Sequence, residues 1–359
     1  MKKSFFLSIL AVGALVACSK SEVVDTKFDQ AISFENYVGR DAMTKAAVAT
    51  ISTLQDEEYA GIGLYGFYTG NDTAGWTAET NSNLWGNEKL AWNGTGFAYT
   101  TTKYWTNDTD KYTFFAYAPF SATAPSGTTV KDPAVSFTVD PTIKNQVDFL
   151  YSNEKKNTVK TENANGVNLK FNHALSRITV KAQENEDEYG YTIYGVSISG
   201  NFNTSGSLKL SDATWTPTAA AANYVFLADA TDAVGVEVPT PTAEGVTPAV
   251  KAYDFAGTDN YLMVIPTDFS VKEGEAYKET AILTVTYTTT FDNHESNKMT
   301  KTLPINTKFE MGKAYSLNLA FEPNEDNAIT FTVEVNGWGD ETDVNAGNPE
   351  DGTVVNPAA

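Results

Sequence analysis

Few groups in this chain could do covalent or metal chemistry. It holds one cysteine, Cys18, and two histidines, His173 and His294, beside 45 acidic residues. Neither histidine lies in a metal-binding helix pattern, no glycine-rich phosphate loop occurs, and the acidic run from Glu184 to Glu188 lacks the spaced ligands and glycine of a calcium loop. The many carboxylates leave a glycosidase-like pair open, but nothing singles one out. The sequence therefore predicts no enzyme, no catalytic residue, no metal site and no cofactor.

Cys18 follows a short apolar run behind a basic start. Met1-Lys2-Lys3 precedes the stretch from Phe5 to Val16, which is too short to span a bilayer. The Leu-Val-Ala-Cys ending resembles the bacterial lipoprotein box, which is cleaved between positions matching Ala17 and Cys18 so that the thiol can form a thioether to diacylglycerol. We therefore expect a signal peptide over residues 1–17 and acyl chains such as palmitate that hold Cys18 at the outer membrane. The alternative is an ordinary signal peptide with an unpaired cysteine.

Composition places the chain among folded, acidic proteins. Hydrophobic residues make up 42% of the 359 residues and charged residues 19%, which is typical of a globular protein. The formal net charge is -20, and such a surface repels nucleic acid and anionic lipid. Neither is therefore expected as a partner.

Alternation of apolar and polar residues predicts half-buried β-strands along the whole chain. Turn-rich segments separate these stretches, which is typical of antiparallel β-sandwiches, and the length fits two of them. The clearest alternating stretches are Ile32 to Phe34, Val135 to Val139, Leu283 to Tyr287, Tyr315 to Phe321 and Ile329 to Val335.

The polar stretch from Asn153 to Asn168 is the best candidate for a domain boundary. The Ala-, Thr- and Pro-rich piece from Thr216 to Thr247 indicates a weakly structured insertion in the second sandwich. The predicted organisation is a leader (1–17), a propeptide with a first strand (18–40), two sandwich domains (41–165 and 166–338) and a flexible acidic tail (339–359).

A series of segments lies in order along the mature chain: the lipoprotein box, Tyr104-Trp105, Asp110 to Pro119, Val147 to Tyr151, Leu169 to Val180, Gly312 to Tyr315, and Ile329 to Val333 ahead of Trp338. Together these segments resemble the fimbrillin family of Bacteroidetes. That resemblance implies an all-β protein of two transthyretin-like β-sandwich domains. It also implies assembly with other fimbrial subunits into surface fimbriae that support adhesion, with a host or bacterial surface ligand as a further candidate partner.

The resemblance also implies that polymerising subunits lose their first strand to a trypsin-like cut and refill the resulting groove with a strand from a neighbour. Ile32, Phe34 and Val38 form the candidate displaced strand, Arg40 is the candidate cut site, and Lys45 is its alternative. An uncut, permanently anchored protein that anchors fimbriae or binds glycans is the other interpretation.

The donor strand stays undecided. The alternating strand from Ile329 to Val335 could equally belong to the second sandwich, and the tail offers only Val344, Val354 and Val355 as apolar anchors.

Several aromatic residues, the two histidines and one threonine can be interpreted as structural or as functional residues. We expect Phe114, Phe115 and Tyr117 to be core residues, His173 to be a hydrogen-bonded structural histidine, and His294 to lie in a polar hairpin loop. Asp72-Thr73-Ala74 resembles the O-glycosylation acceptor of exported Bacteroidetes proteins, which makes Thr73 a candidate site. Glycan binding would instead use exposed tryptophans of the first domain, namely Trp76, Trp85, Trp92 and Trp105.

Overall fold

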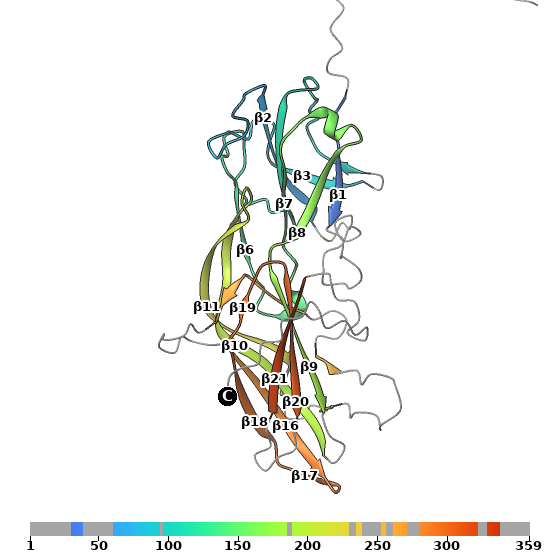
Figure 1. Ribbon diagram of the computed structural model, residues 1–359, viewed down its shortest axis with the longest axis vertical. Helices are drawn as coiled ribbons and strands as arrows, with labels where there is room; N and C mark the ends of the chain where they lie inside the picture. The colour runs from blue at the N-terminus through green and yellow to red at the C-terminus, as the bar shows by residue number, and fades with distance from the viewer. Residues whose placement is uncertain are drawn as a thin grey trace, which may run out of the picture.

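The computed structural model describes residues 30–38, 60–93, 96–184, 189–229, 235–238, 253–255, 261–270, 281–321 and 329–337. Over these residues the chain is almost entirely β-structure, arranged as an elongated body (Figure 1). The described helices are two short 3-10 turns, η2 (Ile143–Asn145) and η3 (Lys160–Asn163), and neither is long and apolar enough to cross a membrane. The predicted all-β fold is confirmed.

One end of the molecule is a seven-stranded sheet in the order β1-β8-β7-β5-β2-β3-β4. Strand β1 lies at its edge and runs parallel to β8, while the other pairings in this sheet are antiparallel. The strands are β1 (Phe34–Val38), β2 (Ile62–Gly70), β3 (Trp85–Trp92), β4 (Phe97–Ala98), β5 (Lys111–Ala118), β7 (Leu150–Thr158) and β8 (Val167–His173).

The central strand β5 is buried on both faces. Phe114 enters the core that also holds Ile32 and Phe34, whereas Phe115 and Tyr117 enter a larger core that continues into the other end of the molecule. A strand with two buried faces reads as a continuous apolar run rather than an alternating one. The prediction that Phe114, Phe115 and Tyr117 are core residues is confirmed.

The other end of the molecule contains two larger sheets and one small one. The first runs β11-β10-β16-β17, with β6, β12 and β18 attached; the second runs β13-β9-β20-β21, with β14 attached; β15 and β19 pair separately. The strands are β6 (Ala134–Thr138), β9 (Ser176–Glu184), β10 (Gly190–Lys209), β11 (Thr214–Leu227), β12 (Val236–Glu237), β13 (Tyr253–Asp254), β14 (Leu262–Val264), β15 (Thr267–Asp268), β16 (Ala281–Phe291), β17 (His294–Glu295), β18 (Met299–Ile305), β19 (Lys308–Phe309), β20 (Lys313–Phe321) and β21 (Ile329–Gly337).

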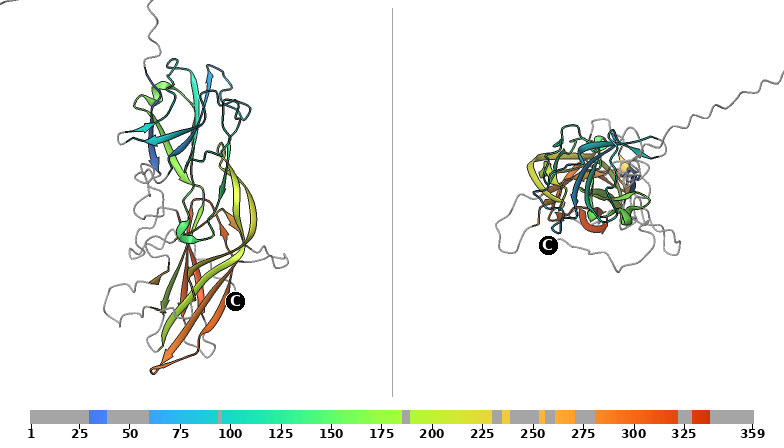
Figure 2. Two further views of the ribbon diagram at one scale, coloured as in Figure 1. Left: turned by 180° about the vertical axis from the view of Figure 1, so that it is seen from behind. Right: turned by 90° about the horizontal axis from the view of Figure 1, so that it is seen from above.

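The long β10–β11 hairpin ties the two ends together (Figure 2). At the turn of this hairpin, the Lys156 ammonium donates a hydrogen bond to the Ser211 carbonyl. The Trp215 indole N–H donates to the Ala174 carbonyl at 2.9 Å, at the point where the chain leaves β8 for β9. Strand β6, from the N-terminal half of the chain, also joins this sheet and pairs antiparallel with the last residues of β10.

The predicted weakly structured insertion from Thr216 to Thr247 is wrong over its first part. Residues 214–227 form the regular strand β11, which pairs antiparallel with β10 along most of its length. The small Ala and Thr side chains there are mostly exposed, so pairing with β10 orders the backbone without burial of a hydrophobic face. Residues 230–234 and 239–247 lie outside the described residues.

The predicted domain boundary between residues 165 and 166 stays a prediction. Strand pairing places β8, on the C-terminal side of that position, in the same sheet as β1 and β7. It places β6, from the N-terminal side, in the sheet of β10. The chain passes from one sheet to the other between His173 and Ser176.

Gly86 provides a test of the packing in the β1-containing sheet. A Cβ added at Gly86 would lie 1.8 Å from the Gly127 carbonyl oxygen. We expect Gly86→Ala to lower the free energy of unfolding by about 1–3 kcal/mol because the backbone of the neighbouring loop must move. Urea titration measures the change, and Gly96→Ala is the matched control because a Cβ at Gly96 meets nothing within 4 Å. Equal effects of the two variants would contradict the prediction.

Candidate functional site: the first-strand site

Phe34 is packed in a box of three aromatic rings. Its ring lies 5.6 Å from Trp85, 5.5 Å from Phe114 and 6.1 Å from Tyr99 between centroids, all in edge-to-face geometry. Ile32, two residues earlier, is fully buried in the same core. Side chains two apart in an extended segment point to the same side, so Ile32 and Phe34 enter the core together while Ser33 stays exposed.

The backbone around Ile32 is paired on both sides. On one side, the Ile32 N–H donates to the Lys103 carbonyl at 2.9 Å, and the Trp105 N–H donates to the Gln30 carbonyl at 3.1 Å. On the other side, the Val167 N–H donates to the Ser33 carbonyl at 2.7 Å. We call this set the first-strand site: the aromatic box, residues 103–105 and the edge of β8.

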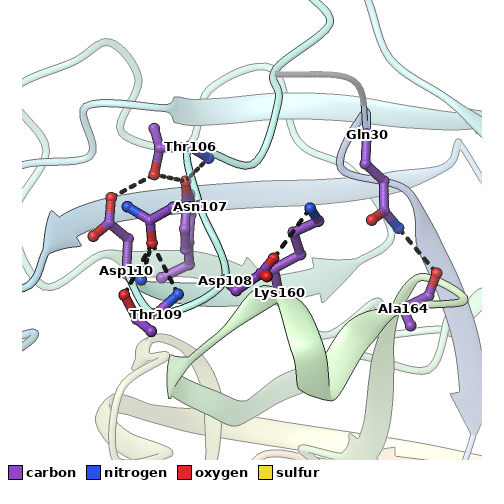
Figure 3. Close-up of polar contacts among 9 residues, drawn as sticks. Gln30, Thr106, Asn107, Asp108, Thr109, Asp110, Lys160 and Ala164 are labelled. Atoms are coloured by element: carbon purple, nitrogen blue, oxygen red, sulfur yellow. Dashed lines mark hydrogen bonds and ion pairs between the residues drawn. The ribbon is translucent and has the colours of Figure 1, made fainter. Parts of the chain in front are cut away.

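Two side chains outside β1 and β8 add hydrogen bonds at the same end of the strand. The Tyr99 hydroxyl donates to the Ile32 carbonyl at 2.5 Å, and burial raises the pKa of Tyr99. The Gln30 side-chain amide donates to the Ala164 carbonyl at 2.9 Å, just after η3 (Figure 3). The chain is therefore held where it enters β1.

A polar turn immediately after residues 103–105 supports the first-strand site (Figure 3). The Asn107 side-chain oxygen accepts from the backbone N–H groups of Thr109, at 2.8 Å, and Asp110, at 2.7 Å. The Lys160 ammonium lies 3.2 Å from an Asp108 carboxyl oxygen and so joins this turn to η3. Asp110, 7% exposed, accepts hydrogen bonds from the Thr106 hydroxyl.

Asp110 makes the stability of this region pH-dependent. Burial raises the pKa of its carboxyl group, but hydrogen bonds from Thr106 and Tyr68 and a further one from Asn107 outweigh burial and hold the pKa below the ordinary 3.8. The stabilisation is therefore present above pH 3.8 and is lost as the pH falls through the lowered pKa.

Asp110→Asn is expected to lower the urea midpoint at pH 7, and its difference from wild type is expected to shrink as the pH falls below 4. Asp108→Asn is the control, because the Asp108 side chain is 66% exposed. If the difference in urea midpoint between wild type and Asp110→Asn stayed constant between pH 7 and pH 3, the lowered pKa of Asp110 would not be the source of the pH dependence.

Sequence comparison places this architecture in a known family. The profile of the fimbrillin-like family matches residues 47–338. The chain belongs to the fimbrillin-like family. A relative, fimbrium subunit Fim1C of Phocaeicola vulgatus, is 28% identical over 195 residues, which cover 50% of each chain. The match therefore spans about half the length of that relative.

A solved structure shares the fold of this fimbrillin-like chain. The crystal structure of a fimbrial protein from Bacteroides vulgatus superposes with a TM-score of 0.65 at 22% identity, covering 86% of this chain and 99% of that one. This likeness supports the all-β fold, whereas the profile match over residues 47–338 confirms the expected membership of the fimbrillin family.

The residues predicted for strand displacement in this fimbrillin-like protein are only partly described. Ile32 and Phe34 lie in the first-strand site, and the backbone of Val38 ends β1 opposite Phe171. Ala17 and Cys18 at the leader, and Arg40 and Lys45 at the candidate cut sites, lie outside the described residues.

Thr73 lies in an exposed turn after β2. The Lys111 ammonium donates to the carbonyls of Asp72, at 2.9 Å, and Thr73, at 3.2 Å, so the turn is fixed while the Thr73 side chain stays exposed. The O-glycosylation of Thr73 stays a prediction.

The tryptophans proposed for glycan binding are mostly used in packing. Trp85 is 2% and Trp105 is 1% exposed, so neither offers a free ring face. Trp76 packs edge-to-face on Phe115, and Trp92 packs against Phe97.

The two histidines differ as predicted. His173 Nδ1 lies 2.7 Å from an Asp148 carboxyl oxygen, and the Asp148 side chain is fully buried. This confirms a hydrogen-bonded structural histidine. His294 is exposed in the β16–β17 hairpin, which is also as predicted.

Among the described residues, no cluster of three or more His, Cys, Asp or Glu could hold a metal ion.

Proposed function

We propose that this chain is a fimbrial subunit that assembles by donor-strand exchange at the first-strand site. The supporting observation is the position of β1: it is an edge strand, and its first residue Phe34 and the preceding Ile32 are buried in the core that also holds Trp85. Loss of these side chains would expose apolar surface worth about 1.5–3 kcal/mol per side chain. A strand from another subunit would recover that free energy, which is the driving force for assembly.

In this proposal, proteolytic cleavage of the precursor opens the first-strand site. The precursor is exported as a lipoprotein and held at the outer membrane through Cys18. A cut after Arg40, with Lys45 as the alternative, removes residues 18–40, which carry both the lipid and β1. The same cut therefore releases the subunit from the membrane and opens the site for a partner subunit, so that a surface fimbria with a role in adhesion can grow.

The test is to identify, by mass spectrometry, the N-terminal residue of this subunit in fimbriae sheared from cells. The proposal expects a start at Asp41, and Arg40→Gln is expected to leave the full precursor on the cell and abolish sheared fibres. Lys45→Gln is the matched control and is expected to assemble normally. A lipidated Cys18 terminus on assembled fibres would refute exchange of β1 and favour an uncleaved lipoprotein that anchors fimbriae or binds glycans.

We also propose that Thr73 carries an O-linked glycan in the exported protein, since its side chain is exposed in the turn after β2. Mass spectrometry of the peptide that contains Thr73 provides the measurement. An unmodified mass from the cell-surface protein would exclude the modification.

A further inference from the structure

Among the described strands, β11, β10, β16 and β18 form one broad sheet face that is built from short, uncharged side chains. These strands pair in this order, and residues directly opposite each other on neighbouring strands point to the same face of a sheet. The register gives one row of Val225, Ser197, Thr284 and Thr302, a second row of Asn223, Ser199, Ile282 and Pro304, and the pair Thr286 and Thr300 beyond the first row. We call these residues the neutral face.

The neutral face points away from the core. The residues that alternate with it along the same strands are buried, among them Ile198, Leu283 and Leu303. The residues of the face itself are exposed or half-buried, and the large hydrophobic side chains of Val225 and Ile282 are 43% and 38% exposed. Depletion of charged residues is typical of the centre of a protein interface.

Charged side chains lie at one edge of the neutral face and are paired there. The Lys298 ammonium lies 2.9 Å from an Asp229 carboxyl oxygen and 4.2 Å from the centroid of the Tyr194 ring. The Tyr194 hydroxyl donates a hydrogen bond to the Glu295 carboxylate at 3.1 Å. A Cβ added at Gly195 would lie 2.9 Å from the Asp229 Cβ, so this group lies where β10 pairs with β16. The charges at this edge are therefore held by contacts within the subunit.

The charge of the whole chain indicates what covers the neutral face. The formal net charge is -20, so two copies of the chain repel each other wherever their acidic surfaces meet. Contact between copies costs least where both present an uncharged face. Serine, threonine and asparagine side chains each donate and accept hydrogen bonds, so a face built from them can complement a second copy of itself, which a two-fold axis requires.

We infer that the neutral face is a contact between two copies of this chain related by a two-fold axis, with Ile282 close to that axis. The face is small, which places the contact among weak, transient interfaces. The contact uses no residue of the first-strand site, and β16 and β18 lie at the end of the molecule away from β1 (Figure 1). In the proposed fimbria it would join neighbouring fibres side by side, and that consequence alone rests on the proposed function.

Sedimentation equilibrium of the uncut subunit tests the contact. Residues 18–359 with Cys18→Ser provide a chain without lipid in which β1 stays in place. The association constant is expected to rise at least about 5-fold between ~0.02 and ~0.5 M NaCl, because salt screens the repulsion between acidic copies. A subunit that stays monomeric at millimolar concentration in high salt would overturn the inference and leave the face to another occupant, such as a neutral glycan.

Ile282→Glu assigns the contact to this face. The variant places two carboxylates near the two-fold axis and is expected to weaken association at least about 10-fold. Phe291→Glu is the matched control, because Phe291 is 52% exposed on the same strand but lies at its hairpin end, outside the neutral face. The control changes the net charge by the same amount and is expected to associate as wild type does. Unchanged association of Ile282→Glu would overturn the assignment.

A mixture of two variants tests the two-fold axis. Ile282→Lys alone is also expected to associate weakly, whereas an equal mixture of Ile282→Lys and Ile282→Glu is expected to associate at least about 10-fold more strongly than either variant alone. Recovery requires folded subunits, so it also excludes loss of the fold as the cause of the weaker association. A mixture without recovery would overturn the two-fold contact. Strand exchange is expected to proceed in Ile282→Glu, so loss of this contact and loss of strand exchange are distinguishable.

Discussion

Phe34→Ala is expected to lower the free energy of unfolding by about 3–5 kcal/mol. Phe34 is 5% exposed and contacts the rings of Trp85, Tyr99 and Phe114, so truncation leaves a cavity between rigid aromatic neighbours. The loss comprises the transfer free energy of the ring, the cavity and the edge-to-face contacts. Urea unfolding followed by tryptophan fluorescence measures the change, because Trp85 lies against the substituted ring.

Ser33→Ala is the matched control for this experiment. Ser33 is the residue directly before Phe34, and its side chain is exposed. Its substitution is expected to change the free energy of unfolding by less than about 0.5 kcal/mol. A cost of Phe34→Ala below about 1 kcal/mol would show that the aromatic box is not packed around this ring, and it would remove the physical basis for strand exchange at this site.

His173→Leu is the second substitution with a large expected effect, about 3 kcal/mol of destabilisation. His173 Nδ1 lies 2.7 Å from a carboxyl oxygen of Asp148, whose side chain is fully buried. Leucine has a similar volume but offers no hydrogen bond, so the cost comes from a buried carboxyl group that has lost this partner. The pair lies where β8 ends and the chain crosses to β9.

The chain contains its own control for this prediction. His294 is exposed in the β16–β17 hairpin, and His294→Leu is expected to cost less than about 0.5 kcal/mol in the same urea titration. The double variant Asp148→Asn, His173→Leu completes a mutant cycle. Strictly additive effects of the two substitutions would contradict a direct interaction between these side chains.

Local periodicity predicted many of the strands of this protein. The alternating stretches around Leu283, Tyr315 and Val333 all lie in strands. In β16 the alternation reflects one buried face, since Leu283 and Val285 are buried whereas the Thr284 side chain between them is only partly so. The sequence did not predict strand β11, because its Ala and Thr residues do not alternate between apolar and polar side chains. Its order comes from hydrogen bonds to β10, a partner that no local pattern identifies.

The sequence identified only some of the residues of the first-strand site. Ile32 and Phe34 stand out by their spacing, and β8 alternates as well, but the other backbone partners come from a segment without a periodic signal. Tyr99 and residues 103–105 lie in an irregular connection, and their role depends on long-range backbone pairing with residues 30–32. Pairing between positions so far apart in sequence is decided by the tertiary fold and leaves no mark on local composition.

The parallel pairing of β1 with β8 also has a consequence for how the protein is made. Phe34 pairs with Val167, which follows it by 167 − 34 = 133 residues. When the chain emerges from its N-terminus, the first strand appears long before the edge on which it docks, and contacts of such sequence separation form late in folding. We therefore expect β1 to dock late, so that the nascent subunit passes through a form with an empty first-strand site. In the proposed strand exchange, polymerisation would pass through the same open form from the opposite direction.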